Sequence, residues 1–310
     1  MPAGNTPESD AGVIHSASVA QLVDAGAENL VNEINRTLSV TALAPLAIGA
    51  GVTATAAASL LCATHHWGWG LLALLLLGAT IWSGKSARAR DLHLKTVRLW
   101  FDLSAEAGSR FKTFEDALER VASCSRVWRI ATEEATGDWK RNAGAGTFVT
   151  RTPVSVVRRL PPHLRCNLRP FSLPCGNQML YFFPDQILVY EGSRAGAVSY
   201  GALEVDAAYT RFPETESVPG DATVIDHTWS YVNRNGGPDR RFSDNAQIPV
   251  CRYQELILRS ASGLNIHLML SHLGVADEFK RAEAQLIPLT REAPHDADQS
   301  PFDDWVRSHR

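Results

Sequence analysis

The predicted fold depends first on the stretch TLSVTALAPLAIGAGVTATAAASLLCATHHWGWGLLALLLLGATIWSG, residues 37–84. These 48 residues contain no Asp, Glu, Lys or Arg, although charged residues make up 20% of the chain. A helix that crosses about 30 Å of hydrocarbon needs about 20 apolar residues. The stretch therefore predicts a transmembrane helical hairpin, with a first span near residues 38–64 and a second near 70–83.

The flanks of this stretch predict its orientation. The short connector at residues 65–70 has no Lys or Arg, and Asp91 is the only acidic residue near the five basic residues that follow the second span. Those residues are Lys85, Arg88, Arg90, Lys95 and Arg98. Because positive charge accumulates on the cytoplasmic side, we expect a bacterial inner (plasma) membrane protein with two spans and with both termini cytoplasmic. Five cysteines without CxxC spacing agree with a reducing compartment.

Three further segments surround the hairpin. Residues 1–15 have the composition of a disordered segment. Apolar residues at helical spacing predict an amphipathic helix over residues 16–36 and a helical stalk over residues 85–139. The small residues of the first span could contact the second span or another copy of the chain. The apolar stripe of the stalk could pack against the downstream domain, the leading helix or a second copy, so a homodimer through the stalk or the first span is one possibility.

A basic, proline-rich connector is predicted at residues 140–177. No acidic residue occurs between Lys140 and Pro184, and the stretch carries seven basic residues: Lys140, Arg141, Arg151, Arg158, Arg159, Arg165 and Arg169. Five prolines exclude one continuous helix. Three interpretations of the charge remain open, namely a solvated surface, contact with anionic lipid, and nucleic acid, of which nucleic acid is the least favoured because few aromatic residues accompany the arginines.

From residue 178 onward the hydrophobic period changes to two, which predicts about seven antiparallel strands and a final helix in a domain at residues 178–288. The expected elements lie near residues 179–183, 187–191, 195–200, 203–211, 222–232, 250–259 and 264–270, with the helix at 275–285. Residues 289–310 are predicted to form an acidic disordered tail. The expected fold class is thus an α+β membrane protein with a C-terminal antiparallel β barrel or sandwich.

This order of elements resembles the pleckstrin-homology-like (PH-like) fold. The opening YFFPDQILVY at residues 181–190, followed by AVSYGAL at 197–203, looks like the bacterial and GRAM-type versions. Segments HTWSYVN (227–233), GGPDRRF (236–242) and SGLN (262–265) also look like a module of uncharacterised bacterial membrane-associated proteins. The resemblance implies a small β domain used for binding, and it implies no particular ligand.

The loop at residues 233–244 is the best candidate for function, because arginines gather beside aromatic residues. Such a loop could bind a phosphorylated headgroup or an acidic peptide. The structural alternative is that Asp239 and Asp244 pair with Arg240 and Arg241 and hold the loop in shape. The candidate lipid-binding or partner-binding residues are Arg158, Arg159, Trp229, Tyr231, Arg234, Arg240 and Arg241.

The sequence contains no motif that assigns an enzyme activity. Walker, dinucleotide-binding, HExxH and GxSxG motifs do not occur, so no catalytic residue, metal or cofactor is expected. The predicted function is a membrane-anchored scaffold or adaptor whose cytoplasmic PH-like domain binds a protein partner or anionic lipid. The alternative is a membrane-bound hydrolase or nuclease with its site in the 233–244 loop.

Overall fold

A computed structural model describes residue 14 and residues 16–22, 28–39, 43–64, 68–94, 96–135, 147–233 and 235–286. The chain divides into two compact units, which are treated separately below. The hairpin unit comprises residues 32–100 and 161–167. The β unit comprises residues 1–31, 101–160 and 168–310. The boundary between the two units, at residues 31 and 32, falls within helix α1 (Glu28–Ser39).

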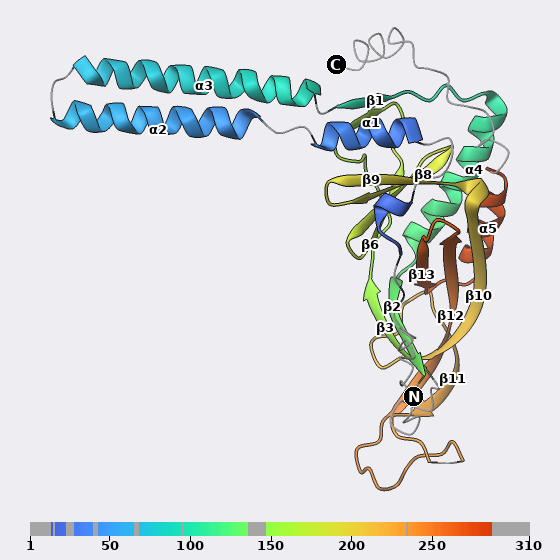
Figure 1. The fold of residues 1–310 in the computed structure, drawn as a ribbon. Coiled ribbons are helices and arrows are strands. Elements are labelled where there is room, and N and C mark those ends of the chain that lie inside the picture. The colour runs from blue at the N-terminus through green and yellow to red at the C-terminus, as the bar shows by residue number, and fades with distance from the viewer. Residues whose placement is uncertain are drawn as a thin grey trace, which may run out of the picture. The chain divides into compact units, whose positions relative to one another are not determined.

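The hairpin unit is built on two antiparallel helices, α2 (Leu43–Thr64) and α3 (Gly68–Leu94) (Figure 1). Small residues let the helices approach closely, because a Cβ added to Gly51 would collide with the side chain of Thr80. A Cβ at Gly84 would lie 3.0 Å from Cγ1 of Ile48. Two short strands of the same unit, β1 (Val97–Leu99) and β5 (Leu164–Cys166), pair in parallel.

The prediction of a transmembrane hairpin is wrong. Among the residues that the structure describes, no helix is both long enough and apolar enough to cross a membrane. Most residues of α2 are Ala, Gly, Ser or Thr, and the charge-free part of α3 ends at Gly84, after which Lys85 begins a charged segment. The α+β membrane fold, the two spans and the inner-membrane location with cytoplasmic termini are therefore not retained.

The β unit contains two antiparallel sheets. The five-stranded sheet has the order β4 (Val157–Arg158), β6 (Phe171–Cys175), β7 (Gln178–Phe182), β8 (Gln186–Glu191), β9 (Arg194–Ser199). The six-stranded sheet has the order β10 (Leu203–Pro213), β12 (Gln247–Ser260), β13 (Asn265–Leu270), β2 (Val127–Ala135), β3 (Thr147–Pro153), and β11 (Thr223–Trp229) also pairs with β12.

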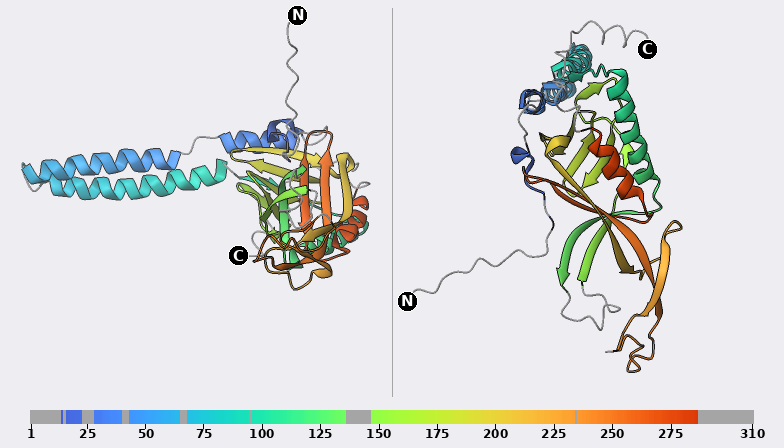
Figure 2. Two further views of the ribbon diagram at one scale, coloured as in Figure 1. Left: turned by 90° about the horizontal axis from the view of Figure 1, so that it is seen from below. Right: turned by 90° about the vertical axis from the view of Figure 1, so that its right-hand side faces the viewer.

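Strand β12 organises the six-stranded sheet because it is 14 residues long. Residues 250–260 of β12 pair with β10. On its other edge, residues 254–259 pair with β13 and residues 247–252 pair with β11. The sheet curls strongly, so that its strands cross at a wide angle in the right-hand view of Figure 2. Strand β12 thus contributes to two separate apolar clusters. Leu256 and Leu258 belong to the main core, and Cys251 and Tyr253 belong to a smaller cluster with Trp128.

Two helices cover the main core. Helix α4 (Ala105–Ser123) begins after Ser104, whose hydroxyl accepts a hydrogen bond from the backbone N–H of Ala107 at 3.2 Å. Helix α5 (Val275–Ala284) packs beside it (Figure 2). The fully buried ring of Phe114 in α4 lies 5.2–6.0 Å, between ring centroids, from three other rings. These belong to Phe182 of β7, Tyr200 of the 3-10 turn η2 (Tyr200–Ala202), and Phe279 of α5.

An N-terminal strap, residues 16–22 with the 3-10 turn η1 (Val19–Gln21), binds both sheets. The Ala17 N–H donates to the carbonyl of Gly263 at 2.7 Å, in the turn between β12 and β13. The Ala197 N–H of β9 donates to the carbonyl of Leu22, also at 2.7 Å. This contact requires glycine at position 196, because an added Cβ would lie only 2.5 Å from the Leu22 carbonyl oxygen.

All seven strands expected after residue 178 are present, and the expected final helix is α5. The helical stalk predicted at residues 85–139 is helical in the end of α3 and in α4, whereas Val97–Leu99 and Val127–Ala135 form strands β1 and β2, so the prediction is wrong for those two segments. The connector at 140–177 contains strands β3, β4, β5 and β6. Of the amphipathic helix at 16–36, residues 19–21 form the turn η1, and α1 begins at Glu28. Residues 1–13 and 289–310 lie outside the described part of the chain.

Replacing Gly196 by Ala should destabilise the β unit. The new Cβ would displace the strap, and overpacking of this kind costs about 1–3 kcal/mol in free energy of unfolding. The matched control is Gly201→Ala, since no atom of the described residues lies within 4 Å of a Cβ there. Urea unfolding measures both variants. Equal stability of Gly196→Ala and Gly201→Ala would contradict the role assigned to the strap.

Candidate functional site

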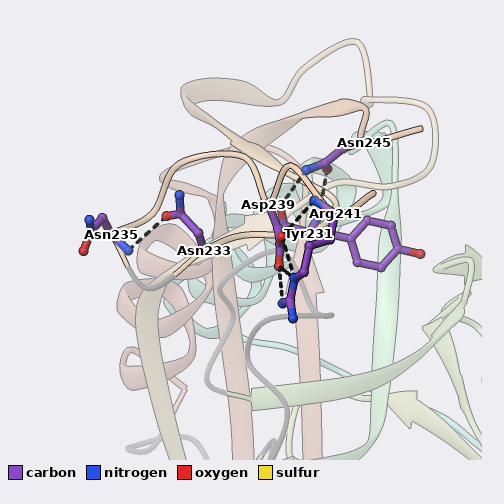
Figure 3. A network of polar contacts seen from close by, with 6 residues as sticks. All are labelled: Tyr231, Asn233, Asn235, Asp239, Arg241 and Asn245. Carbon is purple, nitrogen blue, oxygen red and sulfur yellow. Dashed lines mark hydrogen bonds and ion pairs between the residues drawn. The ribbon is translucent and has the colours of Figure 1, made fainter. Parts of the chain in front are cut away.

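The loop that sequence analysis singled out connects β11 to β12, and side-chain amides hold its backbone (Figure 3). The Asn233 Oδ1 accepts hydrogen bonds from the N–H groups of Asn235 and Gly237, at 3.0 and 2.9 Å. The Asn245 side chain bonds both backbone groups of Tyr231, accepting at 2.9 Å and donating at 2.7 Å. In this loop, where strand pairing has ended, the two side-chain amides bond backbone groups that a neighbouring strand would otherwise bond.

Asp239 and Arg241 form the central ion pair of the loop (Figure 3). The Asp239 carboxylate accepts from Nη2 of Arg241 at 2.5 Å, from its Nε at 3.0 Å and from its backbone N–H at 3.1 Å. The hydrogen bond and the charge of Asp239 raise the pKa of the Arg241 guanidinium. The carboxylate is buried and both of its oxygens bond to Arg241, so this pairing supports the structural alternative.

The loop also presents an exposed aromatic and basic surface. The ring of Phe242 stacks on that of Tyr231, with centroids 4.0 Å apart and planes 10° apart. Arg240 is exposed, and 74% of the Arg241 side chain is accessible despite its ion pair. Trp229, at the end of β11, is half-buried. Sequence analysis did not include Phe242 among the site residues, although an aromatic residue directly after two arginines was a usable signal.

The remaining predicted site residues do not join this surface. Arg234 lies outside the described residues. Arg158 and Arg159 follow one another at the end of β4, in the other sheet. The Arg158 guanidinium binds Glu115 and Glu119 of α4, at 2.5 and 3.4 Å, and lies 4.1 Å from the centroid of the Phe171 ring. Arg158 therefore fastens β4 to α4, while the neighbouring Arg159 side chain is exposed.

A buried ion pair that sequence analysis missed lies inside the curl of the six-stranded sheet. Arg151 comes from edge strand β3, and Glu214 follows β10 at the opposite edge. The guanidinium donates to both carboxylate oxygens, at 2.9 and 2.5 Å, and the Tyr253 hydroxyl donates to the same carboxylate at 2.7 Å. The rings of Trp128 and Phe212 lie 4.4 and 4.5 Å from the guanidinium carbon. The pair thus joins the two edges of the curled sheet.

Hydrogen bonding decides the charge state of Glu214. Burial raises the pKa of this carboxyl, but the hydrogen bonds from Arg151 and Tyr253 outweigh burial, and the pKa lies below its ordinary value. A carboxyl with a lowered folded-state pKa stabilises the fold above its unfolded-state pKa, and that stabilisation is lost as the pH falls through the folded-state pKa. The ion pair therefore stabilises the β unit at neutral pH and fails only in acid.

Glu214→Gln should destabilise the chain strongly at pH 7, because it leaves the buried Arg151 charge with only the exposed Glu216 carboxylate, 3.6 Å away, as a counterion. Breaking a buried pair in this way costs about 3–5 kcal/mol. The matched control is Asp206→Asn, which removes the exposed ion pair with Lys280 at 3.3 Å and should cost less than about 1 kcal/mol. Denaturant unfolding at pH 7 and at pH 3 measures both. A Glu214→Gln loss no larger than that of the control would contradict the assignment.

Nucleophilic and metal chemistry finds little support in the described residues. Burial raises the pKa of the Cys124 thiol to about 11 and that of Cys175 to about 12, so both thiols stay protonated at neutral pH. Burial, with the nearby Arg259 charge, lowers the pKa of His267. Within the described ranges, no three His, Cys, Asp or Glu side chains lie close enough together to hold a metal ion.

Exposed apolar side chains gather on the hairpin unit. Four of its side chains are about two thirds or more exposed: Leu60 (70%), Leu74 (66%), Leu75 (71%) and Trp82 (73%). The hydroxyls along both helices bond to carbonyl oxygens of their own helix, at 2.7–3.1 Å; they belong to Thr53, Thr55, Ser59, Thr80 and Ser83. Between residues 46 and 84 the exposed side chains named above are therefore apolar, and these five hydroxyls are bonded within their own helices.

Comparisons with protein-family models, with curated proteins and with solved structures found no match to this chain.

Asp239→Asn should loosen the loop without unfolding the β unit. The neutral amide cannot keep its charge-assisted hydrogen bonds with Arg241, and such bonds contribute about 1.5–3 kcal/mol. Hydrogen exchange of residues 231–245 should therefore accelerate by about tenfold or more. The control is Asp244→Asn, an exposed residue of the same loop. If hydrogen exchange of residues 231–245 is unchanged in Asp239→Asn, the ion pair between Asp239 and Arg241 does not hold the loop in shape.

Proposed function

We propose that this protein is a non-catalytic scaffold that pairs with a second copy through helices α2 and α3. In this proposal the β unit keeps the binding role that its resemblance to PH-like domains implies. The observation that carries the proposal is the exposed apolar surface of the hairpin unit, which includes Leu60, Leu74, Leu75 and Trp82.

Such a surface is unfavourable in water. Burying a leucine side chain contributes about 1.5–3 kcal/mol, and large exposed apolar patches mark contact sites. The stretch at residues 37–84 also has no charged residue that would keep the hairpin apart from an apolar partner. Because the helix hydroxyls are bonded internally, contact with a partner sacrifices few hydrogen bonds to water.

A second copy is the partner that this surface fits best. The small residues are used within each hairpin, where Gly51 meets Thr80, and the leucines are left on the outside. Two hairpins with leucine faces can form a four-helix bundle, which is the usual way to bury such faces. Symmetric pairing of identical copies is also the commonest form of association among soluble proteins.

The aromatic and basic surface of the β11–β12 loop is the proposed site for a different protein. Its exposed or half-buried residues are Trp229, Tyr231, Arg240, Arg241 and Phe242. Aromatic residues and arginine are the types that dominate binding energy at protein interfaces. A dimer would present two copies of this surface, which favours a partner with two binding sites through avidity.

The pairing is tested by light scattering on the full-length chain. The wild-type protein should have twice the mass of one chain, and Leu74→Gln combined with Leu75→Gln should raise the dimer dissociation constant by more than about tenfold. The matched control is Val224→Gln with Ile225→Gln, two exposed apolar residues of β11 outside the hairpin, which should leave the dimer intact.

Three outcomes would overturn the proposal. One is a wild-type chain that is monomeric at micromolar concentration. Another is a dimer that the control variant dissociates as fully as the leucine variant does. The third is a monomer that floats with phosphatidylcholine vesicles in a Leu75-dependent manner, which would assign the exposed leucines to lipid instead of to a second copy.

A further inference from the structure

Two arginines lie directly opposite each other in the short two-stranded ribbon of the hairpin unit. Strands β1 and β5 pair in parallel, and Arg98 is the register partner of Arg165. A backbone hydrogen bond fixes this register, because the Val97 N–H donates to the carbonyl of His163 at 2.8 Å, directly before β5 begins. Residues paired in this way on neighbouring strands place their side chains on the same face. The two guanidinium groups therefore share one face of the ribbon.

That face is open to solvent. The neighbours of the two arginines along each strand point to the opposite face, where Val97, Leu164 and Cys166 are buried. Arg98 and Arg165 are both exposed. Within the described ranges, no carboxylate pairs with Arg165. Because like charges directly opposite each other are destabilising, the stability of the ribbon gives no reason for this arrangement.

The hairpin unit as a whole carries charge of the same sign. Residues 32–100 and 161–167 contain seven Lys and Arg and two Asp and Glu, so the formal charge of the unit is +5 in a chain whose total is −3. Six of the seven basic residues follow Gly84 in the sequence. A concentration of positive charge raises the local concentration of anions. The arginine pair thus belongs to a unit whose net charge favours an anionic ligand.

We propose that Arg98 and Arg165 together bind the phosphoryl group of a phosphate monoester. A carboxylate is satisfied by one guanidinium, with which it forms two parallel hydrogen bonds. A phosphoryl monoester carries about −1.5 to −2 charges at pH 7 and has three strong acceptor oxygens, so it can bond two guanidiniums at once. The two positive charges, which repel each other across the ribbon, are then both compensated.

NMR titration of the full-length chain tests the site through the side-chain Nε–H signals of arginine. Methyl phosphate is the probe. Arg98→Gln and Arg165→Gln should each raise its dissociation constant by about tenfold or more, because each removes charge-assisted hydrogen bonds. Arg165→Lys keeps the charge but loses the paired hydrogen bonds, so it should recover only part of the affinity. Dimethyl phosphate, a diester with a single charge, should bind more weakly than methyl phosphate.

The matched control is Arg36→Gln, an exposed arginine of the same unit that lies outside the ribbon. It lowers the charge of the unit as much as Arg165→Gln does, and it should leave the dissociation constant nearly unchanged. Sedimentation with phosphatidylcholine vesicles that contain phosphatidate identifies the source of the phosphoryl group. Binding that needs both arginines assigns it to a lipid headgroup, and lack of binding assigns it to a soluble molecule or a phosphorylated protein.

Three results would overturn the site. The first is a wild-type chain that does not bind methyl phosphate. The second is an Arg36→Gln variant that loses as much affinity as Arg165→Gln, because the effect would then belong to the charge of the unit and not to the ribbon. The third is dimethyl phosphate binding as tightly as methyl phosphate, which would favour the diester backbone of a nucleic acid.

Discussion

The β unit depends most on the packing of Phe114. This fully buried ring of α4 contacts Phe182 from the five-stranded sheet, Tyr200 from the turn that leads into β10, and Phe279 from α5. Helix α5 packs in turn on β10 and β12 of the six-stranded sheet. Aromatic contacts of this kind contribute beyond the burial of their area. A single side chain thus couples the five-stranded sheet and the turn that leads into β10 with helices α4 and α5.

The two units solve the problem of buried polar groups in different ways. In the β unit, the Arg151 and Glu214 charges are buried but bonded to each other inside the curl. In the hairpin unit, charge is missing from residues 37–84, and the hydroxyls bond to their own helix. The β unit thus keeps charged residues in its fold, whereas the hairpin unit exposes leucine side chains on α2 and α3. The proposed pairing follows from that difference, because exposed apolar patches mark contact sites.

Sequence analysis was most accurate where the hydrophobic period was regular. The strands after residue 178 alternate clearly, and all seven are present. Strand β2 was missed because Ala and Glu in VWRIATEEA favour a helix, and β6 because Pro174 argues against a strand. In the structure β4 pairs with β6 only at Phe171 and Ser172, so on that side Pro174 has no strand partner that needs its N–H. The charge-free stretch was read as two spans because absence of charge was given more weight than its many small residues.

The candidate site shows the same limit. Pairing of Asp239 with Arg241 was foreseen as an alternative because the residues are close in sequence. The contact between Arg151 and Glu214 joins residues 63 positions apart. Only the curl of the sheet brings these two groups together, and the curl does not follow from local pattern. Long-range contacts between single polar residues therefore stayed outside the sequence-based predictions.

The central claim, that a second copy covers the hairpin, is tested most directly by site-specific photocrosslinking in intact producing cells. A benzophenone amino acid replaces Leu75, and the products are mapped by mass spectrometry with two isotopically distinct forms of the chain. The account predicts crosslinks from position 75 to residues 43–94 of the other copy. Crosslinks only to lipid, or only to unrelated proteins, would contradict it.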